Sequence, residues 1–164
     1  MHYFSYKKES SIKEIKKILV PVDFSAASEV LARYSKIMAK TFDAEILLLH
    51  VLMDLGDLHQ VYVPQDTLKK VEEDALKGVK NQMESFAKNN FKDFNVKTQI
   101  IVGDPAAEIV EFATKQDVDL IIMGTHGRKG IDKIVFGSVA QRVVKRATCP
   151  VVTLNPYRLK ELPS

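Results

Sequence analysis

The sequence predicts an α/β domain in which strands and helices alternate along the whole chain. Five short apolar runs have the length of strands, at residues 15–22, 44–51, 96–102, 120–123 and 149–154. The segments between them carry apolar residues three and four positions apart, which is the spacing of a helix with one buried face. The apolar runs lack polar alternation, as parallel strands covered on both sides do. We therefore expect a parallel sheet with helices on both faces and right-handed crossovers.

Length and composition fit one soluble domain. Of the 164 residues, 46% are hydrophobic and 27% are charged, which is ordinary for a globular protein. The net charge of +3 arises within residues 1–20, so we expect a basic arm at 1–14, a neutral domain at 15–155 and a tail at 156–164. A neutral domain disfavours nucleic-acid binding, and no apolar run suits a membrane span or a secretory signal. Cys149 is the only cysteine, which excludes an internal disulfide and suits the cytoplasm.

In the first half of the chain, turn residues bound each element. Pro21 lies near the end of the first strand, where a missing N–H is least harmful. Ser25 fits the N-cap of a helix that runs to about Thr41. His50 closes the second strand and is expected to be a structural histidine with satisfied hydrogen bonds. Residues 52–66 form a long, unusually apolar connection that could cover a ligand or contact a partner subunit.

The second half contains a long helix, expected from Thr67, and two shorter helices. The apolar residues of the long helix are Leu68, Val71, Ala75, Leu76, Val79, Met83 and Phe86. Asp104 followed by Pro105 is the pattern of an N-cap and a first helical residue. A last helix is expected over 138–146, and Pro156 ends the final strand.

Five strands wound in both directions favour the order 3-2-1-4-5, a doubly wound, Rossmann-like sheet. In this order the first and fourth strands are neighbours, and the winding reverses between them. Ligands of open α/β sheets bind at this point, outside the carboxyl ends of the strands. The two loops that leave those ends are 21–25 and 124–137, so the candidate site lies between them.

The second of these loops has the features of an anion-binding site. Gly124, Gly127 and Gly137 allow the backbone to approach a ligand closely. The helix that starts near Ser138 offers unpaired N–H groups and the positive end of its dipole. The Ser138 hydroxyl can add a donor, and Arg128 with two nearby lysines adds positive charge. These residues predict a phosphate site.

The spacing G-x2-G-x9-G-[ST] from Gly124 to Ser138 resembles the nucleotide-binding signature of the universal stress protein family. Four further segments resemble the family in its own order: 17–25, 47–51, 102–105 and 149–154. Together the matching segments cover nearly the whole chain. The resemblance implies an α/β domain that binds adenine nucleotides, usually as a homodimer, without a well-defined turnover reaction.

The resemblance also implies roles for individual residues. Asp23 would accept hydrogen bonds from ribose hydroxyls, or alternatively only fixes the turn into the helix. Val22 and Val51 would lie beside the adenine, and backbone N–H groups of the glycine loop would hold the phosphates. The predicted ATP-binding residues are Pro21, Val22, Asp23, Val51, Met123, Gly124, Gly127, Arg128, Gly137, Ser138 and Val139. No metal ligand is predicted from the protein, and Mg²⁺ or Mn²⁺ would come with the phosphates.

Other kinds of site are disfavoured. The sequence has no G-x-x-x-x-G-K-[ST] motif and no G-x-G-x-x-G after the first strand, which argues against a P-loop NTPase and a dinucleotide fold. The four histidines lack the spacing of zinc ligands. Ser138, His126 and Asp23 do not suit a catalytic triad, because the serine is expected at a helix cap. Cys149 precedes a buried strand, so an inert thiol is expected. We predict no catalytic residue and slow turnover at most.

The last strand, 150–154, would form an apolar edge of the sheet, and such edges need covering. Pairing with the same strand of a second subunit would cover it symmetrically, and the resemblance implies the same homodimer. The tail at 157–164 could cover it instead.

Three functions remain open. The leading hypothesis is a cytoplasmic universal stress protein that binds ATP and acts as a regulatory module in a stress response. The first alternative is a slow ATP-hydrolysing or adenylyl-transferring enzyme, in which 52–66 would form one wall of a second substrate pocket. The second is a regulatory dimer that binds no nucleotide and keeps its glycines only as turns.

Overall fold

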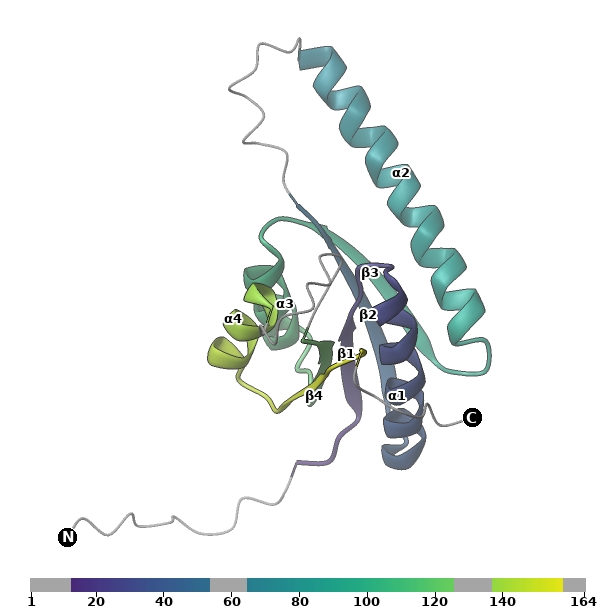
Figure 1. Cartoon of the computed structure of the whole chain (residues 1–164), viewed down its shortest axis with the longest axis vertical. Coiled ribbons are helices and arrows are strands. Elements are labelled where there is room, and N and C mark those ends of the chain that lie inside the picture. Colours follow the sequence, from purple (N-terminus) through teal and green to yellow (C-terminus); the bar gives the residue numbers. More distant parts are fainter. Residues whose placement is uncertain (1–12, 54–64, 126–136, 158–164) are drawn as a thin grey trace, which may run out of the picture.

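The computed structural model describes residues 13–53, 65–125 and 137–157. These residues form a five-stranded parallel sheet with α1 and α2 on one face and α3 and α4 on the other (Figure 1). The strands are β1 (Lys17–Pro21), β2 (Glu45–Leu52), β3 (Val96–Val102), β4 (Leu120–Gly124) and β5 (Val151–Leu154). The helices are α1 (Ala26–Phe42), α2 (Gln65–Asn90), α3 (Pro105–Lys115) and α4 (Ser138–Arg146). The strand order β3-β2-β1-β4-β5 confirms the prediction.

Strand β1 forms the centre of the hydrophobic core. It pairs with β2 on one side and β4 on the other, and Ile18, Leu19 and Val20 have no exposed surface. Because successive side chains of a strand point to opposite faces, Ile18 and Val20 pack under α1 and α2 whereas Leu19 packs under α3 and α4. Each such buried side chain contributes about 1.5–3 kcal/mol relative to an exposed one.

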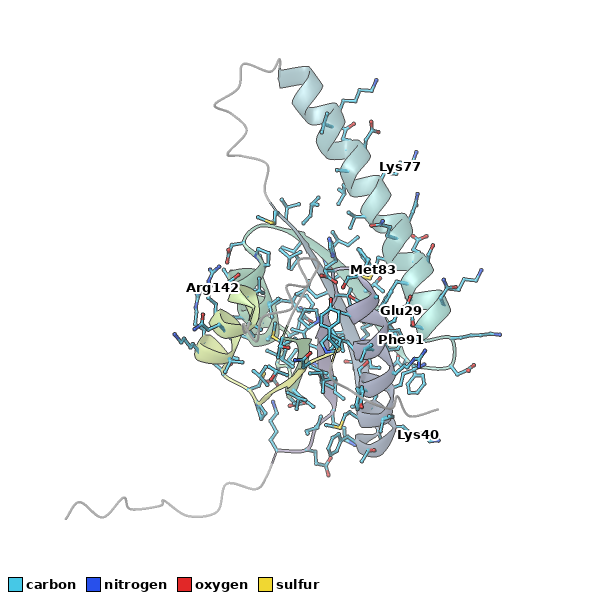
Figure 2. All side chains as sticks on the ribbon, in the orientation of Figure 1. Glu29, Lys40, Lys77, Met83, Phe91 and Arg142 are labelled. Carbon is cyan, nitrogen blue, oxygen red and sulfur yellow. The ribbon has the colours of Figure 1, made fainter. Side chains whose placement is uncertain are left out.

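Helix α2 is longer than the sheet that it covers. It begins at Gln65, earlier than the predicted Thr67, and its 26 residues span about 39 Å. Met83 and Phe86 in its second half are buried, but Val71 in its first half is 49% exposed. Figure 1 shows this first half extending past the strands, and Figure 2 shows Met83 on the inner side of the helix. The predicted apolar face is therefore buried only where the sheet lies beneath it.

The helix starts follow the predicted capping signals in part. Asp104 caps α3, because its Oδ1 accepts a hydrogen bond from the Ala107 N–H at 2.9 Å. The Arg142 guanidinium donates two hydrogen bonds to the same carboxylate, at 2.9 and 2.6 Å, and so joins α4 to α3. Ser25 lies at the N-cap of α1, but its hydroxyl makes no capping hydrogen bond. At α4 the N-cap is Gly137, and Ser138 is the first helical residue.

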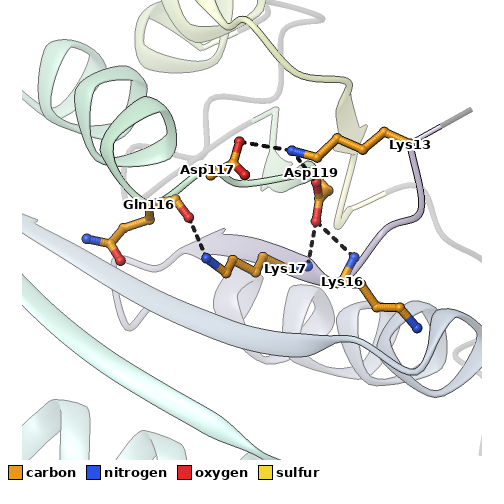
Figure 3. A network of polar contacts seen from close by, with 6 residues as sticks. All are labelled: Lys13, Lys16, Lys17, Gln116, Asp117 and Asp119. Carbon is orange, nitrogen blue, oxygen red and sulfur yellow. Dashed lines mark hydrogen bonds and ion pairs between the residues drawn. The ribbon is translucent and has the colours of Figure 1, made fainter. Parts of the chain in front are cut away.

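Asp119 joins the beginnings of β1 and β4 at the amino edge of the sheet (Figure 3). Its side chain is 6% exposed, and Oδ2 accepts hydrogen bonds from the N–H groups of Lys16 and Lys17, both at 2.9 Å. The Lys13 ammonium lies 2.8 Å from Oδ1. Burial alone would raise the pKa of Asp119, but the ammonium and the two N–H groups outweigh burial and hold the pKa below its ordinary value.

Within the described ranges, none of the helices combines the length and the apolar character that crossing a membrane requires.

Replacement of Asp119 by Asn should lower the free energy of unfolding at pH 7 by about 1–3 kcal/mol, because it weakens acceptors for two sequestered N–H groups. The Lys13 ammonium and the two N–H groups hold the pKa of Asp119 below its ordinary value, so the ionised carboxylate stabilises the fold at pH values above the ordinary carboxyl pKa, and this contribution disappears as the pH falls through the native pKa. Urea unfolding at several pH values should therefore show wild type and variant converging in acid. Asp117→Asn is the control, because the Asp117 side chain is 82% exposed. A constant difference down to low pH would contradict the assignment.

Candidate functional site

The predicted site residues of the first and fourth strands lie side by side at the carboxyl edge of the sheet. Ile18 pairs with Leu120 and Leu19 with Ile121 in parallel register. Continuing this register brings Pro21 level with Met123, and Val22 level with Gly124. Strands β2 and β1 are also in parallel register, so Val51 reaches the same edge from the other side of β1. The topology therefore gathers the ends of three strands at the winding reversal.

Backbone hydrogen bonds bring the two ends of the glycine loop together. The Gly137 N–H donates to the Thr125 carbonyl oxygen at 2.7 Å, and the Thr125 N–H donates to the Leu154 carbonyl oxygen at 2.8 Å. The end of β4 therefore lies against the start of α4 and the end of β5. Because the Gly137 N–H already has an acceptor, the donors that α4 can offer to an anion begin with those of Ser138 and Val139.

Predicted apolar contacts gather on one face of the sheet. Val51, Met123 and Val139 belong to the apolar cluster beneath α3 and α4, where Met123 is 4% exposed. Val22 packs on the opposite face, beneath α1 and α2. Its N–H donates to the Leu49 carbonyl oxygen at 2.8 Å, and its carbonyl oxygen lies 2.8 Å from Nδ1 of His50. The side chain of Val22 therefore faces away from the other apolar site residues.

The Asp23 carboxylate is held in one orientation by the start of α1. Its Oδ1 accepts hydrogen bonds from the Ser25 N–H at 3.0 Å, the Ser25 hydroxyl at 2.6 Å and the Ser28 hydroxyl at 2.9 Å. The Ser28 oxygen in turn accepts the Asp23 N–H at 3.1 Å. Asp23 therefore fixes the turn into the helix, which was one of its two expected roles. The same arrangement also presents a rigid carboxylate at the strand end.

Three residues at this edge were not in the predicted contact set. Ser28 is 1% exposed and holds Asp23, His50 is 7% exposed and holds Val22, and Thr125 is 9% exposed and holds Gly137. The expectation that His50 is a buried, hydrogen-bonded histidine is confirmed. Of these three residues, only Ser28 could have been found from the sequence, because Ser, Thr, Asn and Asp near the start of a helix commonly bond to the local backbone.

Two predicted contacts, Gly127 and Arg128, lie outside the described residues, as do His126 and most of the connection at 52–66. Among the residues that the structure describes, no three His, Cys, Asp or Glu side chains form a group that could hold a metal ion.

Cys149 packs against the apolar cluster beneath α3 and α4, and burial raises the pKa of its thiol. A raised pKa disfavours the reactive thiolate.

Comparison with known proteins finds similarity along most of the chain. The model of the universal stress protein family matches residues 14–155. Universal stress protein MJ0531 from Methanocaldococcus jannaschii is 38% identical over 145 residues, which cover 85% of this chain and 82% of that protein. The solved structure of MJ0577, from the same organism, superposes with a TM-score of 0.76 at 33% identity and covers 87% of this chain and 97% of its own.

A structure of a universal stress protein from Archaeoglobus fulgidus in complex with dAMP has a TM-score of 0.56 and 22% identity. It covers 86% of this chain and 98% of its own. At this identity the likeness shows that the two proteins share a fold.

Replacement of Ser28 by Ala should lower the free energy of unfolding by about 1–3 kcal/mol, because the Asp23 N–H and carboxylate both lose a partner in a buried position. Urea unfolding followed by circular dichroism would measure the change. Ser25→Ala is the matched control, since Ser25 is less buried and its N–H still reaches Asp23 after the substitution. Equal, small effects of the two changes would show that Ser28 does not hold the turn.

Proposed function

Because the chain belongs to the universal stress protein family, we propose that it is a cytoplasmic regulatory module that binds ATP at the carboxyl edge between β1 and β4. The binding domain spans residues 15–155 and is flanked by the basic arm and the tail. The observation that carries this proposal is the Gly137–Thr125 hydrogen bond of 2.7 Å. It sets the N-terminus of α4 at the end of β4, where the first N–H groups and the helix dipole favour phosphate.

The remaining site residues supply complementary groups for the nucleoside. The fixed Asp23 carboxylate offers acceptors for ribose hydroxyls, and its three donors on Oδ1 hold it ready without reorganisation. Val51 and Met123 offer apolar surface on the face beneath α3 and α4, which suits a planar base. The Archaeoglobus fulgidus neighbour of the same fold was solved with dAMP, a ligand of the class proposed here.

We expect Mg²⁺ or Mn²⁺ to enter with the phosphates, because such ions keep several waters and need few protein ligands. We also propose that occupancy of the site, rather than turnover, is the signal. Hydrolysis requires a group that positions and activates water, and Asp23, a carboxylate that follows β1 at this edge, is already engaged in fixing its own turn.

Replacement of Ser138 by Pro tests the phosphate role of α4. Proline is favoured at the first position of a helix and removes only that N–H, and Gly137 before it already has φ −57° and ψ 143°, which suits a residue preceding proline. A hydrogen bond to a charged group contributes about 1.5–3 kcal/mol, so calorimetry should show roughly 10-fold or more weaker binding of Mg²⁺-ATP.

Ser138→Ala is the matched control, because it removes the hydroxyl and keeps the N–H; its effect should be smaller. Binding of adenosine, which has no phosphate, should be unchanged in both variants. Wild-type protein that binds no adenine nucleotide would overturn the proposal. Rapid conversion of added ATP to ADP or AMP would favour an enzyme instead.

We further propose a homodimer formed through β5. The two sheet edges differ in character: β3 exposes Lys97, Thr98 and Gln99, which discourage pairing with another strand, whereas β5 is Val-Val-Thr-Leu. The carbonyl oxygens of Pro150 and Leu154 accept hydrogen bonds from Ile121 of β4 and from Thr125, which follows β4. Since backbone groups alternate in direction along a strand, those of Val151 and Thr153 face outward and can pair with a second copy.

Replacement of Thr153 by Pro should therefore produce monomers, because it removes an outward N–H from the edge of the sheet while the acceptors for β4 remain. Light scattering after size-exclusion chromatography would measure the mass, and circular dichroism would check the fold. Thr153→Ala, which keeps the N–H, should remain dimeric. A monomeric wild-type protein would show that something other than a second copy, such as the tail at 157–164, covers the edge.

A further inference from the structure

The turn that carries Asp23 contains a backbone conformation that its own sequence disfavours. Phe24, the next residue, has φ +60°. This left-handed region is uncommon for a bulky residue and is adopted most readily by Gly, Asn and Asp. Such a conformation persists only when surrounding contacts impose it. The neighbours of Phe24 and Val22 therefore help to fix where the Asp23 carboxylate points, together with the hydrogen bonds that it accepts from Ser25 and Ser28.

His50 contacts the turn on both sides of Asp23. Its Nδ1 lies 2.8 Å from the carbonyl oxygen of Val22, and because a carbonyl only accepts, the hydrogen of this bond is on Nδ1. The imidazole also stacks on the Phe24 ring, with centroids 4.5 Å apart and planes inclined by 26°. One side chain of β2 thus holds the residue before Asp23 through its backbone and the residue after it through its ring.

Ser25 and Ser28 hold Asp23 itself from the start of α1, whereas His50 holds the residues on either side of it. On the side of α2, Phe24 meets Phe86 edge to face with centroids 6.0 Å apart, a longer distance than the 4.5 Å of its stack on His50. His50 itself is 7% exposed and is built into β2, whose register with β1 is continuous from Lys17 to Pro21. The imidazole is therefore fixed relative to the strand that ends at the site.

We propose that His50 is a positioning residue of the nucleotide site: by holding Val22 and Phe24 it orients the Asp23 carboxylate toward the ribose. This inference rests on the proposed function. It assigns to His50 an effect on selectivity for the sugar, which a histidine that only fills the core would not have. The base, for which Val51 and Met123 offer apolar surface, and the phosphates, which we assign to the start of α4, should not depend on the two contacts that His50 makes to the turn.

Two substitutions separate the two contacts. His50→Asn keeps an N–H donor near the position of Nδ1 but removes the ring, and His50→Phe keeps a ring but removes the donor. Calorimetry would compare Mg²⁺-ATP with 2′,3′-dideoxy-ATP, which lacks both ribose hydroxyls. We expect wild type to prefer ATP by roughly 10-fold or more, because each lost hydrogen bond to a carboxylate is costly. His50→Phe should lose most of this preference while binding the dideoxy nucleotide as wild type does.

The asparagine variant should recover part of the preference, because it restores the bond to Val22. In a protein that also carries Asp23→Ala, His50→Phe should cause no further change, since it acts through that carboxylate. If the His50 variants do not fold, Phe24→Leu is the substitute test, because it removes the ring stack and leaves the buried imidazole unchanged. It should reduce the preference as His50→Asn does.

Equal loss of affinity for both nucleotides, or no loss for either, would overturn the inference. If wild type binds neither nucleotide, the proposed function itself fails, and amide hydrogen exchange then decides whether His50 holds the turn. Exchange of the Asp23 and Ser25 N–H groups at least 10-fold faster in His50→Phe would retain His50 as the residue that fixes the turn. Unchanged exchange would remove that role as well.

Discussion

The burial of β1 on both faces and along both edges is the constraint on which the other features depend. Ile18, Leu19 and Val20 are fully enclosed, and every backbone polar group of such a strand needs a partner within the protein. Parallel neighbours meet this need only through long crossovers, which carry the helices that cover the faces. The enclosure of β1 is therefore met by parallel neighbours in the sheet, and the crossovers between these strands contain the helices that cover its two faces.

This common direction gives the two edges of the sheet opposite character. At the amino edge, Asp119 accepts hydrogen bonds from the N–H groups at the start of β1, and its own side chain is buried and paired with Lys13. At the carboxyl edge, hydrogen bonds fix the positions of the Asp23 turn and the start of α4, and the first N–H groups of a helix have no acceptor within the helix itself. The buried carboxylate at the amino end of the strands thus has a structural role, whereas the groups gathered at the carboxyl end are candidates for binding a ligand.

Much of the fold could be predicted from the sequence because its signals are local. Apolar runs marked all five strands, and Asp104-Pro105 marked the start of α3. The strand order followed from general rules of winding, and the structure brings the described candidate residues to the carboxyl edge that this order predicts for them. Helix α2 was predicted to begin late, because its first turn carries no capping pattern and its apolar repeat becomes visible only from Leu68.

The contacts that organise the site could not be predicted, because each joins residues that are distant in sequence and individually ordinary. Nothing local distinguishes Thr125 as the acceptor for Gly137, His50 as the partner of Val22, or Asp119 as the partner of residues about a hundred positions earlier. These bonds exist because the topology brings strand ends together. The sequence pattern therefore predicts where the candidate site lies, whereas the contacts within it are seen only in the folded structure.

The central place of β1 also has a consequence for how the chain is made. Its first neighbour, β2, follows after a single helix, but Ile18 pairs with Leu120 on its other side. At a synthesis rate of about 5–20 residues per second, β4 leaves the ribosome several seconds or more after β2. During that interval one apolar edge of β1 has no partner, and slow non-local pairing of this kind leaves a nascent chain open to aggregation. The domain therefore completes its core only when most of its length has been synthesised.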